Sequence, residues 1–431
     1  MSALPIEPIE GPLDALVVVP GSKSITNRAL AAAALADGRS VLEGALHADD
    51  TAAMVDGLAR LGVGIGVDAH TGDLVVQGQG GRLRPGPVEL DARLSGTTAR
   101  FLLPVLALGR GRYHLDGLAP LRRRPMGPSL DALRLLGAVV EEDAEAGRLP
   151  VTVVASGLAG GSLRVPGGAS SQFASGLLLS APAMEGDLHV ELAPPVVSRP
   201  YLELTVATME AFGAAVVGDV DTGVTVRATG YRPRRYRVEP DASAAAYFFA
   251  AALICGGRVR VSGLGPASVQ GDARFVEVLA SMGAEVGHDS EGIEVRAGEA
   301  LHGVDVDLAD LSDTAQTLAV VAVFASSPTR VRGIGFIRDK ETDRIAAVVN
   351  ELRRCGVEAV EHDDGFTVYP GRPVPARIRT YDDHRMAMSF TLLGLRVPGI
   401  EITDPGCVAK TFPRFFDVVD GLRRRPTPVA G

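Results

Sequence analysis

The chain has 431 residues, of which 46% are hydrophobic, and its formal net charge is −9. This length predicts two or three domains with sizeable cores, and the composition excludes a disordered or collagen-like chain. Because the net charge provides no global positive field, nucleic acid and anionic membranes are not expected partners, and any anion must be bound by a local site.

Short apolar segments and isolated cysteines place the chain in the reduced cytosol. Segments 247–255 and 318–325 are far shorter than the ~18 residues of a membrane span, and the first 20 residues lack the features of an export signal. The cysteines at 255, 355 and 407 form no CxxC pair, so we interpret them as small core residues and expect neither disulfides nor structural zinc. We therefore expect a cytoplasmic protein.

In chain order, the first recurring element is an amphipathic helix that ends in glycine and precedes two strands around a polar turn. Five copies are spaced by 70 to 76 residues, with helix-ending glycines at Gly62, Gly137, Gly213, Gly283 and Gly356. A sixth helix at 415–425 has no strands after it. Residues 1–20 contain one unassigned strand, Ala15 to Val19, so we predict that the N-terminus completes the last repeat and belongs with the C-terminal half.

The second recurring element is a helix with a polar first turn and an apolar body. Six copies begin at intervals of 70 to 74 residues, near Ser24, Thr97, Ser171, Ser243, Asp313 and His384. Helices that are apolar on nearly every side are buried, so these should form the domain cores, with the strands and amphipathic helices outside them. Polar residues in the first turn are good helix caps, and for Ser243, which has no cation nearby, we interpret capping as its whole role.

Together these patterns predict an α/β protein of six repeats, three in each of two domains. The Pro- and Arg-rich stretch 231–241 separates them, giving an N-terminal domain at 22–239 and a discontinuous C-terminal domain at 1–21 plus 240–431. Buried parallel helices of one domain all begin at the same end, so their positive N-termini should converge on an interdomain cleft. The expected ligand is strongly anionic.

Basic residues at the helix starts agree with an anion site. Lysine occurs only at 23, 340 and 410, so 40 of the 43 basic residues are arginine, and a lysine retained against this bias is a candidate for a specific role. Of the three arginines at 122–124, we choose Arg124, before the proline, as the one that turns into the cleft. Arg28 and Arg100 on the first two helices and Arg385 on the sixth add further charge.

The segment 338–344 places six charges in seven residues, a pattern usually typical of a solvated surface. It contains Lys340 and Arg344, which would share one face of a helical turn. Glu341 beside them is a candidate proton carrier, and Asp313 at a helix start is a second. The stretch 21–24 lacks the spacing of a phosphate loop, no GxGxxG occurs, and the eight histidines are scattered, so we expect no nucleotide cofactor and no metal.

Eight motifs in this order resemble those of the 5-enolpyruvylshikimate-3-phosphate synthases: PGSKSITNR, SGTTARF, RRPMG, SSQF, SRPY, KETDR, DDHRMAM and AKTFPRF. The resemblance covers nearly the whole chain. It implies the inside-out α/β barrel of the enolpyruvyl transferases, with two domains of three βαβαββ units each. It also implies transfer of the enolpyruvyl group of phosphoenolpyruvate to the 5-hydroxyl of shikimate 3-phosphate, with release of phosphate and without metal or cofactor, by a monomer whose partners are these two small molecules.

The resemblance also implies which residues bind each ligand. Shikimate 3-phosphate is assigned to Lys23, Ser24, Arg28, Ser170, Ser171, Gln172, Ser198, Tyr201, Asp313 and Lys340. Phosphoenolpyruvate is assigned to Lys23, Gly96, Arg124, Gln172, Arg344, Arg385 and Lys410. Asp313 resembles the family's base for the hydroxyl and Glu341 its proton donor to the methylene, and Lys23 assists proton transfer and phosphate departure.

Two departures and two rival functions accompany this resemblance. Leu94 stands where many relatives have asparagine, and Phe336 stands where they have asparagine or histidine. Side-chain contacts to substrate at those two positions are therefore not carried over. Gly96 matches the residue that leaves room for glyphosate in sensitive relatives. The UDP-N-acetylglucosamine enolpyruvyl transferases share the architecture but carry a reactive loop cysteine that 121–125 lacks. A non-catalytic anion-binding protein would need neither Asp313 nor Glu341.

Overall fold

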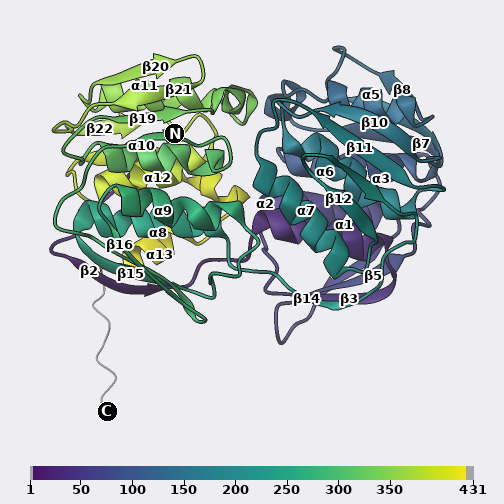
Figure 1. Ribbon diagram of the computed structural model, residues 1–431, viewed down its shortest axis with the longest axis horizontal. Coiled ribbons are helices and arrows are strands. Elements are labelled where there is room, and N and C mark those ends of the chain that lie inside the picture. The colour runs from purple at the N-terminus through teal and green to yellow at the C-terminus, as the bar shows by residue number, and fades with distance from the viewer. Residues whose placement is uncertain (1–2, 424–431) are drawn as a thin grey trace. The chain divides into compact units, whose positions relative to one another are not determined.

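The computed structural model describes residues 3–423. The chain forms two compact units (Figure 1), one at Gly21–Val238 and a discontinuous one that joins the residues up to Pro20 to those from Glu239 onward. Each unit has its own hydrophobic core. Among the described residues, no helix is long and apolar enough to cross a membrane.

Three sheets of four strands form the outside of the unit Gly21–Val238. The first has the order β14-β3-β5-β4, the second β6-β7-β9-β8 and the third β10-β11-β13-β12. The strands are β3 (Asp37–Glu43), β4 (Gly64–Val67), β5 (Leu74–Gln79), β6 (Val88–Asp91), β7 (Arg110–Asp116), β8 (Val139–Glu142), β9 (Val151–Ser156), β10 (Gly161–Pro166), β11 (Leu188–Ala193), β12 (Val216–Asp219), β13 (Gly223–Val226) and β14 (Arg235–Arg237). In each sheet one edge strand pairs in parallel and the others pair antiparallel.

One apolar helix per repeat fills the core of this unit. These core helices are α1 (Lys23–Leu35), α3 (Gly96–Ala107) and α6 (Ser171–Ser180), and they are buried along nearly their whole length. The amphipathic helices are α2 (Asp49–Arg60), α5 (Gly127–Leu135) and α7 (Arg199–Ala211), with short turns at α4 (Ala119–Arg122) and η1 (Ala181–Ala183). Both helix types lie where the two sequence patterns predict them, because the buried set has apolar residues on every side and the other set on one face.

The second unit repeats this plan with one smaller sheet. Its sheets have the orders β16-β17-β15-β2, β18-β19-β21-β20 and β1-β23-β22. The strands are β1 (Ala3–Pro5), β2 (Leu13–Val17), β15 (Gly257–Ser262), β16 (Glu285–Asp289), β17 (Gly292–Arg296), β18 (Asp305–Asp307), β19 (Thr329–Arg332), β20 (Ala359–His362), β21 (Gly365–Val368), β22 (Ala376–Ile378) and β23 (Ile400–Thr403). None of the six sheets of the described chain closes on itself.

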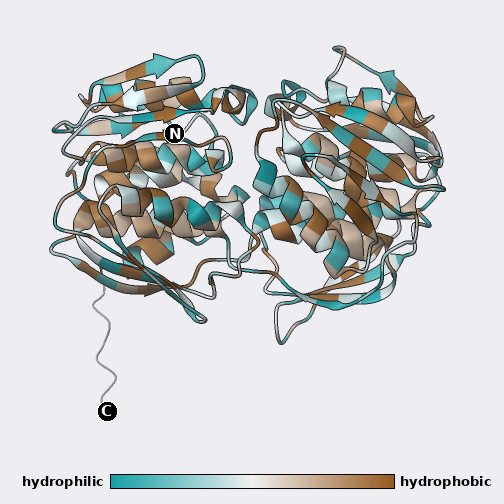
Figure 2. Ribbon diagram, in the orientation of Figure 1, coloured by the Kyte–Doolittle hydropathy of each residue, from teal (hydrophilic) through white to brown (hydrophobic). Residues whose placement is uncertain are grey.

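The core helices of the second unit are α8 (Ala242–Cys255), α10 (Ala315–Ala322) and α12 (His384–Gly394). Figure 2 shows their apolar residues in brown. The outer helices are α9 (Phe275–Ser281), α11 (Arg344–Arg354) and α13 (Phe415–Gly421), and 3₁₀ turns lie at η2 (Gly271–Arg274), η3 (Ser312–Thr314), η4 (Gly335–Asp339) and η5 (Pro405–Lys410). The predicted α/β architecture of six repeats, three in each unit, is confirmed.

The N-terminal segment pairs differently from the prediction. Its predicted strand is β2, at Leu13–Val17, and β2 pairs in parallel with β15 of the fourth repeat rather than completing the sixth. The sixth sheet is completed by β1, which pairs antiparallel with β23. The sequence indicates β2 through its run of valines, whereas the three residues of β1 are too few to show an alternation.

The two chain connections between the units exchange strands. In four repeats the strand before a core helix pairs in parallel with the strand after it, as in β6 and β7. In the remaining two repeats these partners are swapped. β2 precedes α1 but pairs with β15 after α8, and β14 precedes α8 but pairs with β3 after α1 (Figure 1). Each unit therefore contains one strand that is followed, in the sequence, by a core helix of the other unit.

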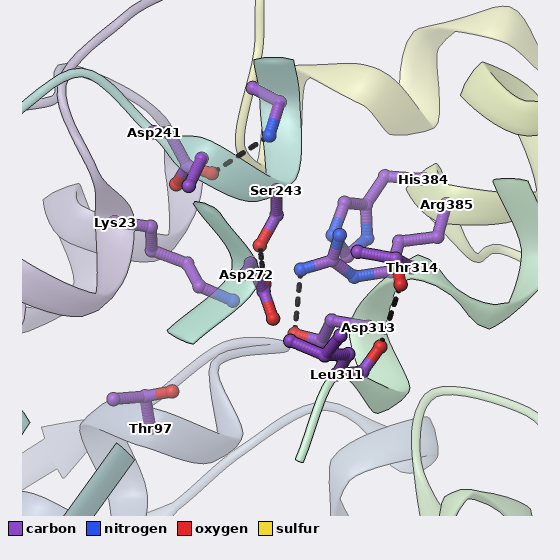
Figure 3. Close-up of polar contacts among 12 residues, drawn as sticks. Lys23, Thr97, Asp241, Ser243, Asp272, Leu311, Asp313, Thr314, His384 and Arg385 are labelled. Atoms are coloured by element: carbon purple, nitrogen blue, oxygen red, sulfur yellow. Dashed lines mark hydrogen bonds and ion pairs between the residues drawn. The ribbon is translucent and has the colours of Figure 1, made fainter. Parts of the chain in front are cut away.

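The residues that cap the core helices lie just before those named by the sequence pattern. Ser22, Ser95 and Ser170 accept hydrogen bonds from the first turns of α1, α3 and α6. Asp241 caps α8 by accepting from the amide of Ala244 at 2.9 Å. The interpretation of Ser243 as a cap is therefore wrong, because its hydroxyl donates to the Asp272 carboxylate instead (Figure 3).

Candidate active site

Arg344, the first residue of α11, is the centre of an ion-pair network in the second unit. Its side chain is 2% exposed. Its Nε donates to Asp383 Oδ2 at 2.7 Å, Nη1 to Asp313 Oδ1 at 2.9 Å and Nη2 to Glu341 Oε2 at 2.9 Å. Burial alone would lower the pKa of Arg344, but the three carboxylates outweigh it and raise that pKa above its ordinary value. Arg344 is therefore a cation throughout the working pH range.

Two further cations extend the network from the other oxygens of the same carboxylates. Arg385 Nη2 donates to Asp313 Oδ2 at 2.7 Å, as Figure 3 shows. Lys410 Nζ donates to Glu341 Oε1 at 2.7 Å. The resulting chain runs Lys410–Glu341–Arg344–Asp313–Arg385 and brings together five residues predicted for the site. Both proposed proton carriers thus contact directly the cations expected to hold an anionic ligand.

Local backbone structure sets the geometry of these cations. Asp383 is fully buried and caps α12, since its Oδ1 accepts from the amide of Arg385 at 2.8 Å. Just before it, Tyr381 and Asp382 have φ of 56° and 57°. A non-glycine residue in this left-handed region costs roughly 1–3 kcal/mol and persists only where neighbouring contacts enforce it. Such strain at the start of α12 marks the turn as a built feature of the site.

Lys340 lies outside the helix that begins at Arg344. It ends the 3₁₀ turn η4, and the cap Asp343 separates it from α11. The prediction that Lys340 and Arg344 share a helix face is therefore wrong. Lys340 Nζ lies 5.7 Å from the centroid of the Phe336 ring, within range of a cation–π interaction. The Phe336 departure thus has a structural consequence, because it gives Lys340 an aromatic neighbour instead of a polar one.

In the unit Gly21–Val238, Arg28 joins α1 to α6 and α7. Its Nε donates to Thr205 Oγ1 at 2.8 Å, its Nη1 to the Ser24 carbonyl at 2.9 Å and its Nη2 to the Tyr201 carbonyl at 2.9 Å. These acceptors are all uncharged. Burial lowers the pKa of Arg28 to about 10, so the protein holds a desolvated cation there without neutralising it through these bonds. An anionic ligand would supply the missing charge.

A second relay in this unit connects α3 and α6. Arg100 Nη1 donates to Gln172 Oε1 at 2.7 Å, and Gln172 Nε2 donates to Thr97 Oγ1 at 3.2 Å. Arg100 Nη2 also donates to the carbonyl of Pro125 at 2.9 Å, which fixes the segment that carries Arg124. Gln172 is therefore held with its amide at the first turn of α3.

Arg124 lies directly against Gly96. A Cβ added at Gly96 would lie 2.5 Å from Arg124 Nη1, which is too close for a normal contact. Of the arginines at 122–124, only Arg124 is buried. Arg122 instead pairs with Asp116 at the surface.

The remaining predicted residues of this unit lie at helix starts. Lys23 begins α1 and pairs with the buried Asp50 of α2 at 3.4 Å. Ser170 caps α6, Ser171 begins it, and Ser198 precedes α7 with φ of 54°. Asp50, Asp383, Thr97 and the relay role of Arg100 are not predicted from the sequence. Each is a partner of a predicted cation or amide, and the cap position of Asp383 before Arg385 is the one signal that could have indicated any of them.

None of the hydrogen bonds and ion pairs described above involves a cysteine. Cys255 and Cys355 are buried, Cys407 is partly buried, and burial raises the pKa of their thiols to about 11, 12 and 12. Over residues 3–423 no group of three or more His, Cys, Asp or Glu side chains could hold a metal ion.

Comparison with known proteins identifies the family. The model of the EPSP synthase (3-phosphoshikimate 1-carboxyvinyltransferase) family matches residues 8–419. A 3-phosphoshikimate 1-carboxyvinyltransferase from Nostoc punctiforme is 45% identical over 417 residues, which cover 96% of this chain and 98% of that protein.

Solved structures agree with this match. The EPSP synthase from Acinetobacter baumannii has a TM-score of 0.82 at 27% identity and covers 98% of both chains. The enolpyruvyl transferase NikO from Streptomyces tendae has a TM-score of 0.79 at 18% identity over 97% of both chains, which shows a shared fold. The chain therefore belongs to the EPSP synthase (3-phosphoshikimate 1-carboxyvinyltransferase) family.

Proposed function

We propose that this chain transfers the enolpyruvyl group of phosphoenolpyruvate to the 5-hydroxyl of shikimate 3-phosphate and releases phosphate. The family match and the name of the Nostoc relative support this reaction. The observation that carries it is the contact of Asp313 and Glu341 with Arg344, because it joins two candidate proton carriers to a buried cation. A protein that only captured anions would gain nothing from carboxylates that compete with its ligand.

Phosphoenolpyruvate is assigned to the cations of this network. Its phosphate and carboxylate are suited to the planar guanidinium groups of Arg344 and Arg385, which can each donate two parallel hydrogen bonds, and to the point charge of Lys410. In the other unit, Lys23, Gly96, Arg124 and Gln172 are assigned to the same ligand. The ligand must compete with Asp313 and Glu341 for the cations that these carboxylates now hold.

Shikimate 3-phosphate is assigned mainly to residues of α1, α6 and α7. Arg28 supports this assignment because its hydrogen-bond acceptors are uncharged, so that these bonds leave its positive charge to be balanced by an anionic ligand. The hydroxyl groups of Ser24, Ser171 and Tyr201 are suited to the ligand's phosphate and hydroxyls. Asp313 and Lys340 complete the assignment from the second unit, together with Lys23, Ser170, Gln172 and Ser198 from the first.

The proposed chemistry is an addition followed by an elimination. Asp313 accepts the proton of the 5-hydroxyl as that oxygen forms a bond to C2 of phosphoenolpyruvate, and Glu341 donates a proton to the methylene carbon C3. The C2–O bond to phosphate then breaks, phosphate leaves with the electron pair, and C3 returns a proton to Glu341 as the double bond re-forms. No atom is oxidised or reduced, and nearby cations stabilise the phosphate as it leaves.

The test is release of inorganic phosphate from phosphoenolpyruvate by the purified chain, with and without shikimate 3-phosphate, in excess chelator. We expect release that requires both substrates and is unaffected by the chelator. Release with UDP-N-acetylglucosamine instead would refute the proposed acceptor, and no release with either would favour an anion-binding protein.

Variants identify the proton carriers in the same assay. Asp313→Asn and Glu341→Gln should each lower kcat by at least 100-fold, since general acid or base catalysis contributes about 10²–10⁴-fold. Asp339→Asn is the matched control, because it changes an exposed carboxylate two residues from Glu341. Equal effects of all three substitutions would contradict these roles.

We also propose that the chain works in the cytoplasm. We propose further that it works as a monomer, because all of the assigned residues come from one chain. Light scattering on the purified protein tests the oligomeric state, and a dimer as the active species would contradict it.

A further inference from the structure

Glu351, in the interior of α11, is a fully buried carboxylate that the proposed chemistry does not use. A buried acid is unusual and needs several partners. Glu351 Oε1 accepts from the Tyr381 hydroxyl at 2.7 Å, and Oε2 accepts from the backbone amide of Arg379 and from Arg354 Nε, both at 3.0 Å. Two of these three donors belong to the turn that precedes α12.

That turn has the backbone strain described above and delivers two residues of the ion-pair network. Tyr381 and Asp382 are both in the left-handed region, and neither is glycine. The next residue, Asp383, binds Arg344 and caps α12, and Arg385 follows in the first turn. Because two strained residues in succession do not hold their conformation alone, outside contacts must enforce it.

The contacts that enforce it come from one face of α11. Arg344 and Glu351 are seven residues apart, which is two helical turns, so they lie on the same side of the helix. Arg344 contacts the end of the turn at Asp383, and Glu351 contacts its beginning at Arg379 and its strained middle at Tyr381. The turn is therefore held at both ends by a single rigid element.

We propose that Glu351 is a positioning residue that fixes the turn 379–383 through Tyr381 and the Arg379 amide, and so places Asp383 to orient Arg344 and places Arg385 to bind phosphoenolpyruvate. The choice of anion rests on the proposed function. Burial raises the pKa of Tyr381 to about 12, which keeps its hydroxyl a hydrogen-bond donor. Arg354, the third donor, has a side chain that is 38% exposed and contacts the same carboxylate without contacting the turn through these bonds.

Three variants separate positioning from simple packing. Tyr381→Phe removes one hydroxyl and leaves the carboxylate and ring in place. Glu351→Gln keeps the shape of the side chain but leaves only one oxygen as an acceptor, whereas the three donors now bind both oxygens of the carboxylate. Arg354→Gln is the matched control, since it removes the contact to Glu351 that does not involve the turn. For each variant we would measure the urea midpoint, kcat, KM for both substrates, and the Kd of phosphoenolpyruvate by calorimetry.

We expect Tyr381→Phe to raise KM and Kd for phosphoenolpyruvate about tenfold, and Glu351→Gln to raise them further, since a hydrogen bond to a charged group is worth that factor or more. KM for shikimate 3-phosphate should change less than twofold, and Arg354→Gln should leave all these constants within twofold. Unchanged binding of phosphoenolpyruvate in Tyr381→Phe would overturn the proposal. Equal losses for both substrates alongside a lower urea midpoint would also overturn it, because they indicate a purely structural role.

Calorimetry keeps this result separate from the proposed function. A parent protein that binds phosphoenolpyruvate without releasing phosphate would refute the transferase reaction, while the Kd values of the variants would still decide the role of Glu351.

Discussion

Replacing Asp383 by asparagine should destabilise the protein through one bond of the ion-pair network. The carboxylate is fully buried and binds Arg344 twice, through Oδ2 to Nε at 2.7 Å and through Oδ1 to Nη2 at 3.3 Å. Asparagine keeps the shape and keeps one oxygen, which can still cap α12, since it is as good a cap as aspartate. Its amide nitrogen cannot accept from Arg344, so the 2.7 Å bond is replaced by two donors that face each other.

The size of the effect follows from what Arg344 retains. A hydrogen bond between charged groups contributes about 1.5–3 kcal/mol, and breaking a buried ion pair outright costs about 3–5 kcal/mol because a lone charge remains. Arg344 keeps Asp313 and Glu341 at 2.9 Å each, so its charge is not left alone. We therefore expect Asp383→Asn to lower the free energy of unfolding by about 2–3 kcal/mol.

Urea unfolding followed by circular dichroism measures this difference, with Asp343→Asn as the matched control. Asp343 also caps a helix and pairs with an arginine, but its side chain is 40% exposed. An exposed pair contributes at most ~1 kcal/mol. If Asp383→Asn lost no more stability than Asp343→Asn, the inference that the buried network stabilises this unit would be refuted.

Three further predictions test other parts of the molecule. Gly96→Ala should raise KM for phosphoenolpyruvate at least tenfold in steady-state assays and leave KM for shikimate 3-phosphate within twofold, because its Cβ would lie 2.5 Å from Arg124 Nη1 and displace that group. Arg28→Lys should raise KM for shikimate 3-phosphate about tenfold, since an ammonium cannot make the bonds of the guanidinium in their planar geometry; an unchanged KM would contradict the assignment. Burial raises the pKa of Tyr247 to about 12, so between pH 10 and 12 the hydroxyl ionises in the unfolded chain but not in the folded one. The parent protein therefore loses about 1 kcal/mol of its free energy of unfolding by pH 11, a loss that Tyr247→Phe should not show when urea midpoints are compared. Parallel stability profiles of the two proteins from pH 8 to 11 would show that this shift is absent.

The six repeats could be predicted because their signals are local. A helix that is apolar on all sides, such as α8, and a helix that ends in glycine with positive φ, as at Gly283, appear within a dozen residues of sequence. The exchange of β2 and β14 between the two connections is not local. β14 has three residues, Arg235–Arg237, two of them charged, and only its pairing with β3 makes it a strand.

The site divides in the same way. The scarcity of lysine indicated Lys23, Lys340 and Lys410, because composition is visible in the sequence. Glu351 reads as an ordinary polar position of a surface helix, and only the packing of α11 against 379–381 reveals that it is buried. The partners of functional residues are brought together by tertiary structure. Sequence patterns therefore indicate the functional residues themselves and miss their partners.

The charges of the two units suggest why the proposed chemistry uses carboxylates that are already paired. In the second unit Asp313, Glu341 and Asp383 balance Arg344, Arg385 and Lys410, whereas Arg28 in the first unit donates to uncharged acceptors. Under the proposed function, shikimate 3-phosphate adds a missing negative charge at Arg28. Phosphoenolpyruvate instead exchanges with Asp313 and Glu341 for the same cations, so little net electrostatic energy is gained. What the exchange does provide is release of the two carboxylates from their cations, so that Asp313 can accept the proton of the 5-hydroxyl and Glu341 can take up the proton that it donates to the methylene carbon.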